Sequence, residues 1–268
     1  MVAYMDHKDL SNRIISQERT VQIADGVKKV AERIAKAEEA AGRREGSVAL
    51  LAATKTRDVG EIMAAIDAGI RLIGENRPQE VTAKAEGLIE SCRERGLQLG
   101  GDSSGSQTVG FHLIGQLQSN KINKVLPYVD TVESVDGLEL ARKVASRAQA
   151  KGLIKGIFLE VNESGEEAKS GCGPDQALDL AYELAGMEGI RLDGLMTIGA
   201  HVDDEVTIRQ GFSHLRGLRD TIRSSGEPGA DSCTALSMGM TGDLDYAVAE
   251  GSTIVRVGTA IFGQRAFI

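Results

Sequence analysis

The sequence predicts an α/β fold, a single (β/α)8 TIM barrel with an extra N-terminal helix. Short apolar runs alternate with amphipathic segments along the chain, eight such runs are present, and no Gly-x-Gly-x-x-Gly motif follows the first run. Strict alternation implies parallel strands, and a count of eight favours closure into a barrel. An open doubly wound sheet is the alternative, which the missing dinucleotide-binding motif weakens.

The N-terminal part of the chain precedes the barrel pattern. Residues 1–17 are polar and are expected to form a flexible N-terminus, so that residues 18–268 make up the one domain. Apolar positions at helical spacing over 18–41 predict the extra helix. The stretch 48–80 then has the pattern of a strand, a helix, a second strand and the start of another helix.

The other elements follow from the same alternation. Asp58 is expected to cap the first barrel helix and Gly69 to end it. A Gly/Ser tract at 100–107 predicts a flexible surface loop, because the alternation resumes unchanged beyond it. We expect strands at 48–54, 70–76, 111–115, 129–132, 154–161, 191–198, 235–237 and 253–257, and further helices at 78–93, 118–126, 136–150, 205–225, 244–250 and 259–262 and from residue 174.

Composition limits the class of partner. The 268 residues carry a net charge of −8, which argues against nucleic acid as the main partner and disfavours an anionic membrane. No apolar run approaches the roughly 20 residues that span a bilayer, and the first residues lack a secretory pattern. We therefore expect a cytoplasmic protein.

The cysteines and histidines do not indicate a metal site. Cys92, Cys172 and Cys233 are odd in number and widely spaced, without a Cys-x-x-Cys pair. The four histidines show no metal-ligand spacing. We expect three ordinary thiols and no bound metal.

Lys55 is the first candidate site residue. It closes a buried strand, where an ammonium group is costly and tends to lose its proton. A neutral amine in a pocket is a nucleophile that forms a Schiff base with a carbonyl group. The right-handed crossover places Lys55 and Asn76 at the same carboxyl edge of two strands. The alternative is that Lys55 begins a surface loop and its amine reaches water.

The loops after the seventh and eighth strands have the composition of a phosphate site. Ser237, Gly239, Gly258 and Thr259 lie there, and the last loop runs into a short helix. Glycine lets the backbone approach an anion, hydroxyls donate to it, and barrels of this type often hold phosphate at these loops. For each loop alone, an ordinary turn is the alternative.

Arg256 lies inside the eighth predicted strand, where its guanidinium needs a partner because it cannot shed its charge. A structural carboxylate is one possible partner. The other is a ring nitrogen acting as acceptor, which would keep that nitrogen unprotonated and make the ring a poor electron sink.

Seven motifs together resemble the YggS/PROSC family of pyridoxal phosphate homeostasis proteins. The resemblance runs in order from about residue 48 to residue 265. Departures are modest: Ile73 and Phe111 replace common Phe and Trp, and the Gly/Ser loop is longer. The motifs are Ala-Ala-Thr-Lys55-Thr, Ile73-Gly-Glu-Asn76, Phe111-His-Leu-Ile-Gly-Gln-Leu-Gln-Ser-Asn-Lys121, Lys169-Ser-Gly, Gly194-Leu-Met-Thr-Ile198, Leu236-Ser-Met-Gly-Met240 and Val255-Arg-Val-Gly-Thr-Ala-Ile-Phe-Gly263.

The resemblance implies an alanine-racemase-like barrel that binds pyridoxal 5′-phosphate (PLP) as a Schiff base on Lys55. Arg256 would face the pyridine nitrogen, and Asn76 would lie beside the ring. The residues implied around the phosphate are Ser237, Gly239, Gly258 and Thr259.

Three function classes are open. A racemase needs a second acid/base group opposite the lysine, which racemases of this type take from an additional β domain. This chain stops at Ile268, and no tyrosine lies at a strand end. We therefore expect a PLP carrier in vitamin B6 homeostasis, without turnover, monomeric, with PLP-dependent apoenzymes as recipients. The alternatives are a single-domain amino-acid racemase using Lys55 as its only base and a Schiff-base aldolase.

Three further residues of the motifs receive weaker assignments. His112 is expected to be a hydrogen-bonded core histidine and is given no role. Lys121 either lies on a helix surface or shields the site, and both remain open. Met196 is expected to fill the barrel interior.

Overall fold

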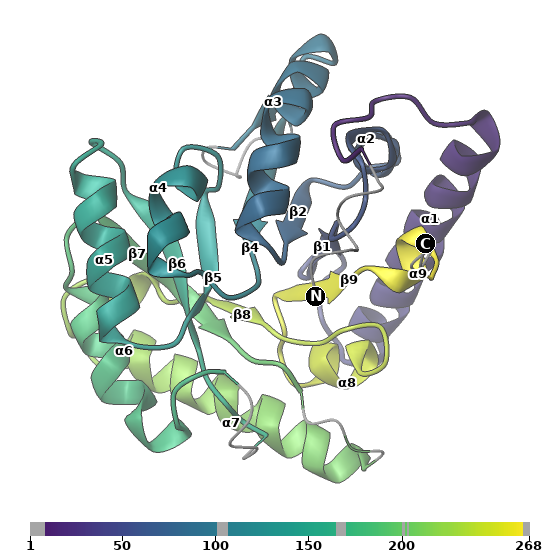
Figure 1. Ribbon diagram of the computed structural model, residues 1–268. Coiled ribbons are helices and arrows are strands. Elements are labelled where there is room, and N and C mark those ends of the chain that lie inside the picture. Colours follow the sequence, from purple (N-terminus) through teal and green to yellow (C-terminus); the bar gives the residue numbers. More distant parts are fainter. Residues whose placement is uncertain (1–8, 101–106, 165–169, 200–201, 203, 265–268) are drawn as a thin grey trace.

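The computed structural model describes residues 9–100, 107–164, 170–199, 202 and 204–264, and it confirms the predicted barrel (Figure 1). Eight parallel strands form one closed sheet, because the order β2-β1-β9-β8-β7-β6-β5-β4 is completed by pairing of β2 with β4. The barrel strands are β1 (Ala49–Ala53), β2 (Leu72–Glu75), β4 (Thr108–Leu113), β5 (Thr131–Val135), β6 (Lys155–Glu160), β7 (Ile190–Met196), β8 (Ala235–Ser237) and β9 (Ile254–Val257).

Helices surround this sheet (Figure 1). The extra N-terminal helix α1 packs against α2, α8 and α9. One further short strand, β3 (Gln98–Leu99), pairs with β4 and was not predicted. The helices are α1 (Gln17–Ala40), α2 (Val59–Asp67), α3 (Pro78–Glu94), α4 (Ile122–Val125), α5 (Leu138–Gln149), α6 (Ala177–Ala185), α7 (Glu205–Ser224), α8 (Leu244–Ala249) and α9 (Thr259–Phe262), with 3-10 turns at Ser119–Lys121, Pro174–Gln176 and Ala230–Ser232.

The predicted cap and stop of α2 are both present. Asp58 accepts a hydrogen bond from the Glu61 backbone N–H at 2.9 Å, and Glu61 reaches back to the Asp58 backbone, which makes a capping box. Gly69 follows the helix with φ +112°, a conformation that glycine adopts at little cost. These local signals fix where the chain turns from β1 into α2 and back into β2.

The barrel has an inner and an outer core. Leu51, Ile114, Phe158, Met196 and Ile254 come from different parts of the barrel and pack together as a separate cluster inside it. Met196 is therefore a barrel-filling residue, as predicted. The larger apolar core lies between the strands and the helices.

The predicted fourth strand was placed too early. The structure has β5 at Thr131–Val135, whereas the apolar run suggested 129–132. The strand continues through Glu133 and Ser134 because both polar side chains have buried partners: Glu133 contacts His112, and Ser134 donates to the Gly115 carbonyl. This shift brings a carboxylate into the barrel wall.

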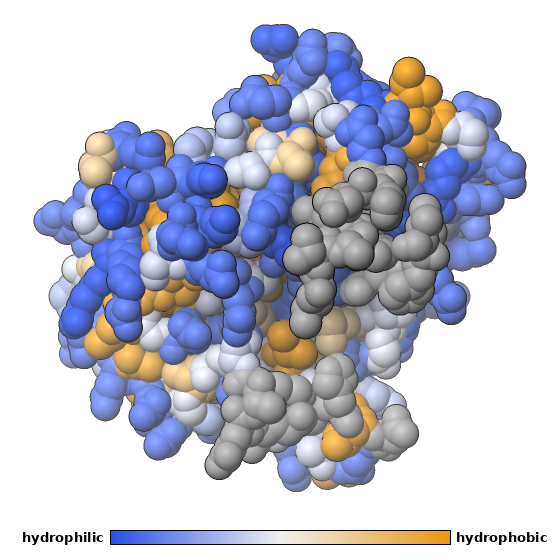
Figure 2. Space-filling view, viewed as in Figure 1, coloured by the Kyte–Doolittle hydropathy of each residue, from blue (hydrophilic) through white to orange (hydrophobic). Residues whose placement is uncertain are grey.

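Hydrophilic residues cover most of the face seen in Figure 2, and the apolar residues on it form small groups. None of the helices in the described part of the chain combines the length and apolar character needed to cross a membrane. Within the same ranges, no group of three or more His, Cys, Asp or Glu side chains is arranged to hold a metal ion.

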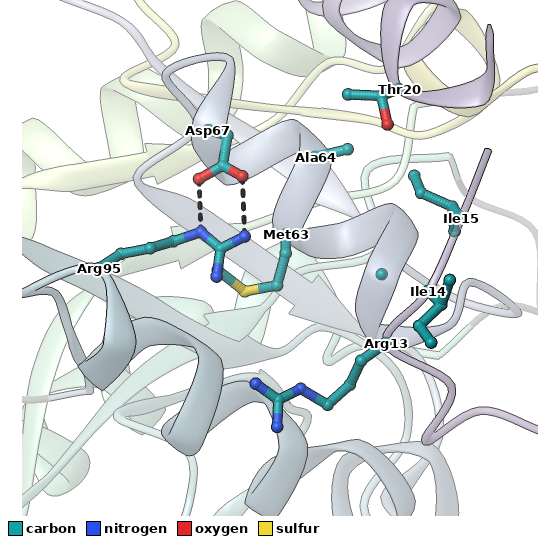
Figure 3. A pocket seen from close by; sticks show the side chains of 9 residues that line it. Arg13, Ile14, Ile15, Thr20, Met63, Ala64, Asp67 and Arg95 are labelled. Carbon is teal, nitrogen blue, oxygen red and sulfur yellow. Dashed lines mark hydrogen bonds and ion pairs between the residues drawn. The ribbon is translucent and has the colours of Figure 1, made fainter. Parts of the chain in front are cut away.

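The segment before α1 lies against α2 and α3. The Leu10 carbonyl accepts from the Val59 backbone N–H at 3.1 Å, and Arg13 forms ion pairs with Glu90 and Glu94 of α3. Figure 3 shows Arg13 beside the shallow pocket that this segment forms with α2. The predicted flexible N-terminus at 1–17 stays a prediction, and residues 1–8 lie outside the described residues, as do most of the Gly/Ser loop, Lys169 and Arg265.

Candidate functional site

Lys55 follows β1 at the carboxyl end of the barrel and is half-buried. In the parallel register, Ala53 pairs with Gly74 of β2, and Leu51 pairs with Arg256 of β9. The residues that come after these pairs therefore meet at one edge, with Lys55 between the ends of β2 and β9. The structure confirms that Lys55 and Asn76 lie at the same edge of two parallel strands.

Asn76 leaves β2 beside a tightly packed glycine. A Cβ at Gly115 would lie 2.2 Å from the Asn76 carbonyl oxygen, so only glycine fits there. The side-chain oxygen Oδ1 of Asn76 is buried and has no hydrogen-bond partner among the described residues. A buried amide oxygen normally has a donor, so this atom is a candidate ligand contact.

Gly239 and Gly258 bring backbone close to the same end of the barrel. Gly239 has φ +94°, and a Cβ there would lie 2.4 Å from the Ala247 side chain. A Cβ at Gly258 would lie 3.1 Å from the Ala53 carbonyl oxygen. Gly258 precedes α9, whose N-terminus has no side-chain cap, and Thr259 at its first position is exposed. These loops offer backbone N–H groups to an anion.

Ser237 and Arg256 form a buried pair. Arg256 donates through Nη1 to the Ser237 carbonyl and hydroxyl, both at 2.7 Å, and through Nη2 to the Thr197 carbonyl at 2.8 Å. Burial lowers the pKa of Arg256, and nearby carboxylates, Glu133 first among them, act in the opposite direction. Its direct partners are thus carbonyls and a hydroxyl, and the Glu133 carboxylate lies one hydrogen bond further away.

Glu133 was missed by sequence reasoning. One oxygen of this fully buried carboxylate accepts from the Ser237 hydroxyl at 2.5 Å, and the other contacts His112 Nδ1 at 2.6 Å. Burial raises the pKa of Glu133, but His112, Arg256 and Ser237 together bring it below its usual value. His112 is hydrogen-bonded and 7% exposed, in agreement with the prediction of a core histidine. Its neighbours in the sequence, Val-Asp-Thr-Val before it and Ser-Val after it, give no signal that sets it apart.

A second buried cluster lies between the barrel and α3. Lys84 contacts Glu75 at 2.6 Å and Glu80 at 2.8 Å, and all three side chains have zero exposure. Burial raises the pKa of Glu75 to about 7, helped by Glu80 and opposed by Lys84. The cluster hydrogen-bonds to Thr54 and Thr56, the neighbours of Lys55. It was not predicted.

Comparison with known proteins now decides the family. The profile of the family "Alanine racemase, N-terminal domain" matches residues 27–266. Pyridoxal phosphate homeostasis proteins of Aquifex aeolicus and Pseudomonas aeruginosa are 34% and 36% identical over 89% and 91% of this chain, and each is covered over 96% of its length. This chain belongs to the family of pyridoxal phosphate homeostasis proteins.

Solved structures agree with this family assignment. An unknown protein from Bifidobacterium adolescentis is 65% identical, with a TM-score of 0.93 over 95% of this chain and 100% of the other. PipY of Synechococcus elongatus, solved with PLP bound, is 29% identical, with a TM-score of 0.68 over 86% of this chain and 100% of PipY. An alanine racemase of Clostridium difficile, 14% identical with a TM-score of 0.65, shares the fold over 93% of this chain and 57% of its own.

The predicted site residues of this family member gather at the carboxyl end of neighbouring strands. Lys55, Asn76, Gly258 and Thr259 follow β1, β2 and β9, which are adjacent in the sheet. Ser237 ends β8, which is next to β9, and Gly239 lies in the loop that follows β8. Arg256 is linked to Ser237 directly. Lys121 is half-buried at the end of a 3-10 turn, and its role stays open.

Proposed function

We propose that this protein binds PLP, carries it as a Schiff base on Lys55 and acts in intracellular PLP homeostasis without turnover of its own. The observation that carries the proposal is the half-buried position of Lys55 at the carboxyl end of β1, between Asn76 and the Gly258 loop. Relatives named pyridoxal phosphate homeostasis proteins and the PLP-bound PipY identify the carbonyl compound.

The residues at this end of the barrel fit PLP. The uncapped N-terminus of α9 and the backbone at Gly239 and Gly258 suit a phosphate, because they present N–H groups and little side-chain bulk. The unpartnered Oδ1 of Asn76 is available to a donor of the ligand. When bound, PLP would supply an aldehyde, and its condensation with an unprotonated amine of Lys55 would release one water molecule.

We include Ser237 among the residues proposed around the phosphate because it ends β8, just before the Gly239 loop. Its hydroxyl is already bonded to Glu133 and Arg256, so it fixes the end of β8 and hence the approach of the Gly239 loop. We propose that Arg256 faces the pyridine nitrogen. A cation that donates to this nitrogen keeps it unprotonated, which weakens the ring as an electron sink and favours carrying over catalysis.

The test is reduction of the protein with borohydride followed by peptide mass mapping. A pyridoxyl adduct is expected on Lys55, absent in Lys55→Ala and retained in the control Lys121→Ala. An adduct on a different lysine, or none, contradicts the proposal. The racemase alternative has its own assay: rapid exchange of the α-proton of any amino acid by the wild-type protein would defeat the carrier function.

The recipients, compartment and assembly are part of the same proposal. We infer that released PLP passes to PLP-dependent apoenzymes in the cytoplasm. The three cysteines are buried free thiols, which suits a reducing compartment. Recovery of activity by an apoenzyme mixed with the PLP-loaded protein tests the transfer, and no recovery above the rate of spontaneous PLP release contradicts it. We further propose a monomer.

A further inference from the structure

The buried cluster of Glu75, Glu80 and Lys84 holds the chain on both sides of Lys55. Lys84 Nζ donates to the Thr54 carbonyl at 3.0 Å, one residue before Lys55. Glu80 Oε2 accepts from the Thr56 backbone N–H at 2.6 Å, one residue after it. Two residues of one helix, α3, thus bind both peptide groups that flank the reactive lysine.

The members of the cluster also bond to one another. Glu75 Oε1 accepts from the Thr54 hydroxyl and from Lys84 Nζ, both at 2.6 Å, and Glu80 Oε2 accepts from Lys84 at 2.8 Å. Burying three ionisable side chains is expensive, and apolar residues of similar volume often give equal or greater stability. A cluster of this kind at this place calls for a role other than stability.

Thr56 adopts a backbone conformation that a β-branched residue rarely takes. Its φ is +66°, and it is the one residue other than glycine with positive φ among those that the structure describes. Such a conformation persists only where neighbouring groups enforce it, and these residues concentrate at functional sites. The Glu80 carboxylate supplies one such constraint, because it binds the N–H of Thr56 itself.

We propose that Glu80 and Lys84, joined by Glu75, are positioning residues that hold the turn at Lys55 so that its amine meets the aldehyde of PLP. The inference rests on the proposed function. Glu80 and Lys84 lie on α3 and act through the backbone on either side of Lys55, while phosphate and ring binding depend on β2, β8 and β9. Their loss therefore affects covalent attachment selectively.

The test compares two ligands in full-length protein freed of cofactor. PLP forms the bond to Lys55, whereas 4′-deoxypyridoxine 5′-phosphate has the same ring and phosphate but no aldehyde. Glu80→Ala is expected to weaken PLP binding at least tenfold and to leave the affinity for the analogue within twofold of wild type. Glu80→Gln keeps an oxygen for the Thr56 N–H and is expected to restore PLP binding to within threefold.

Glu86→Ala is the matched control, because Glu86 lies on the exposed side of the same helix and bonds only to the Tyr128 hydroxyl in the described part of the chain. It is expected to bind both ligands like wild type. Circular dichroism confirms folding of each variant. If Glu80→Ala does not fold, the double variant Lys84→Met/Glu80→Gln, which keeps the cluster's net charge and leaves β2 unchanged, is expected to show the same selective loss through the missing bond to the Thr54 carbonyl.

Equal losses for PLP and the analogue, or no loss for either, overturn the inference. Failure of Glu80→Gln to recover PLP binding also overturns it, because the oxygen that binds Thr56 would then be irrelevant. Wild-type protein that binds the analogue yet leaves no borohydride adduct defeats the proposed function instead.

Discussion

At the residue scale, the candidate site depends on buried ionisable side chains that contact partners on other elements of the chain. Lys55 could be identified because a lysine directly ends an apolar run. Glu133 could not, because its partners His112, Ser237 and Arg256 come from three other strands and only the closed barrel brings them together. The same holds for the cluster around Lys84, whose carboxylates look like ordinary helix and strand-end residues in the sequence.

Glu75 gives a prediction about pH. Its pKa is raised to about 7 in the folded protein, so the native state holds this proton more tightly than the unfolded chain. Glu75 therefore contributes most to the free energy of unfolding below a pH of about 4.5, where it is protonated in both states. This contribution falls as the pH rises through 7, by at most about 3 kcal/mol. Glutamine does not ionise, so Glu75→Gln is expected to gain stability relative to wild type between pH 5 and pH 8.

Urea denaturation of both proteins across this range measures the difference. Glu86→Gln on the exposed side of α3 serves as control and is expected to show no such trend. A difference between wild type and Glu75→Gln that does not change with pH would show that Glu75 titrates normally.

Glu133 gives a prediction about stability. Glu133→Leu removes the carboxylate nearest to Arg256 and leaves the guanidinium without its compensating charge, which is expected to cost about 3 kcal/mol of unfolding free energy. Glu133→Gln keeps an acceptor for the Ser237 hydroxyl and is expected to cost less. Both variants remove the negative charge, so a negligible loss in Glu133→Gln, measured by urea denaturation, would argue against the charge as the cause.

At the element scale, the boundaries that have local signals agree with prediction. Strand β8 and helix α9 match the expected residues, since small turn-forming residues enclose them. The start of β5 and the short strand β3 do not match, and β4 begins three residues before its predicted start at residue 111. β3 and β5 both pair with β4. Pairing between strands depends on the tertiary structure, so it cannot be predicted from one segment of the sequence.

Substitution by alanine is expected to change the stability in opposite directions at two helical glycines, Gly26 and Gly217. A Cβ at Gly26 of α1 would lie 2.5 Å from the Ile261 carbonyl of α9, whereas a Cβ at Gly217 of α7 meets nothing within 4 Å. Gly26→Ala is expected to lose about 1–3 kcal/mol through overpacking. Gly217→Ala is expected to gain up to about 1 kcal/mol from helix propensity. Thermal unfolding checks both, and a loss in both variants would contradict the packing argument.

At the scale of the whole molecule, the count of eight strands predicted closure, and the β2–β4 pairing provides it. The number of strands does not predict their register. The register places Leu51 opposite Arg256 and therefore determines which residues surround Lys55. Register depends on how side chains fill the barrel interior, and that packing involves every strand at once.

The proposed monomer is tested at this scale. Large apolar residues that are exposed in the described ranges include Ile14 before α1, Val21 in α1 and Ile154 before β6, and the face in Figure 2 is mostly hydrophilic. Sedimentation equilibrium is expected to give one species near 28.4 kDa across a tenfold concentration range. A mass that rises toward twice this value would contradict the proposal.

The pairing of β1 with β9 has a consequence for protein synthesis. Lys55 leaves the ribosome early, but the glycine loop beside it is made with the last strand of the barrel. On the proposed function, a nascent chain therefore exposes the amine of Lys55 long before it contains the loop proposed to bind the phosphate. The proposal then implies that PLP binds only after β9 has been made, because a chain that ends before β9 would have the lysine but not the residues proposed around the phosphate.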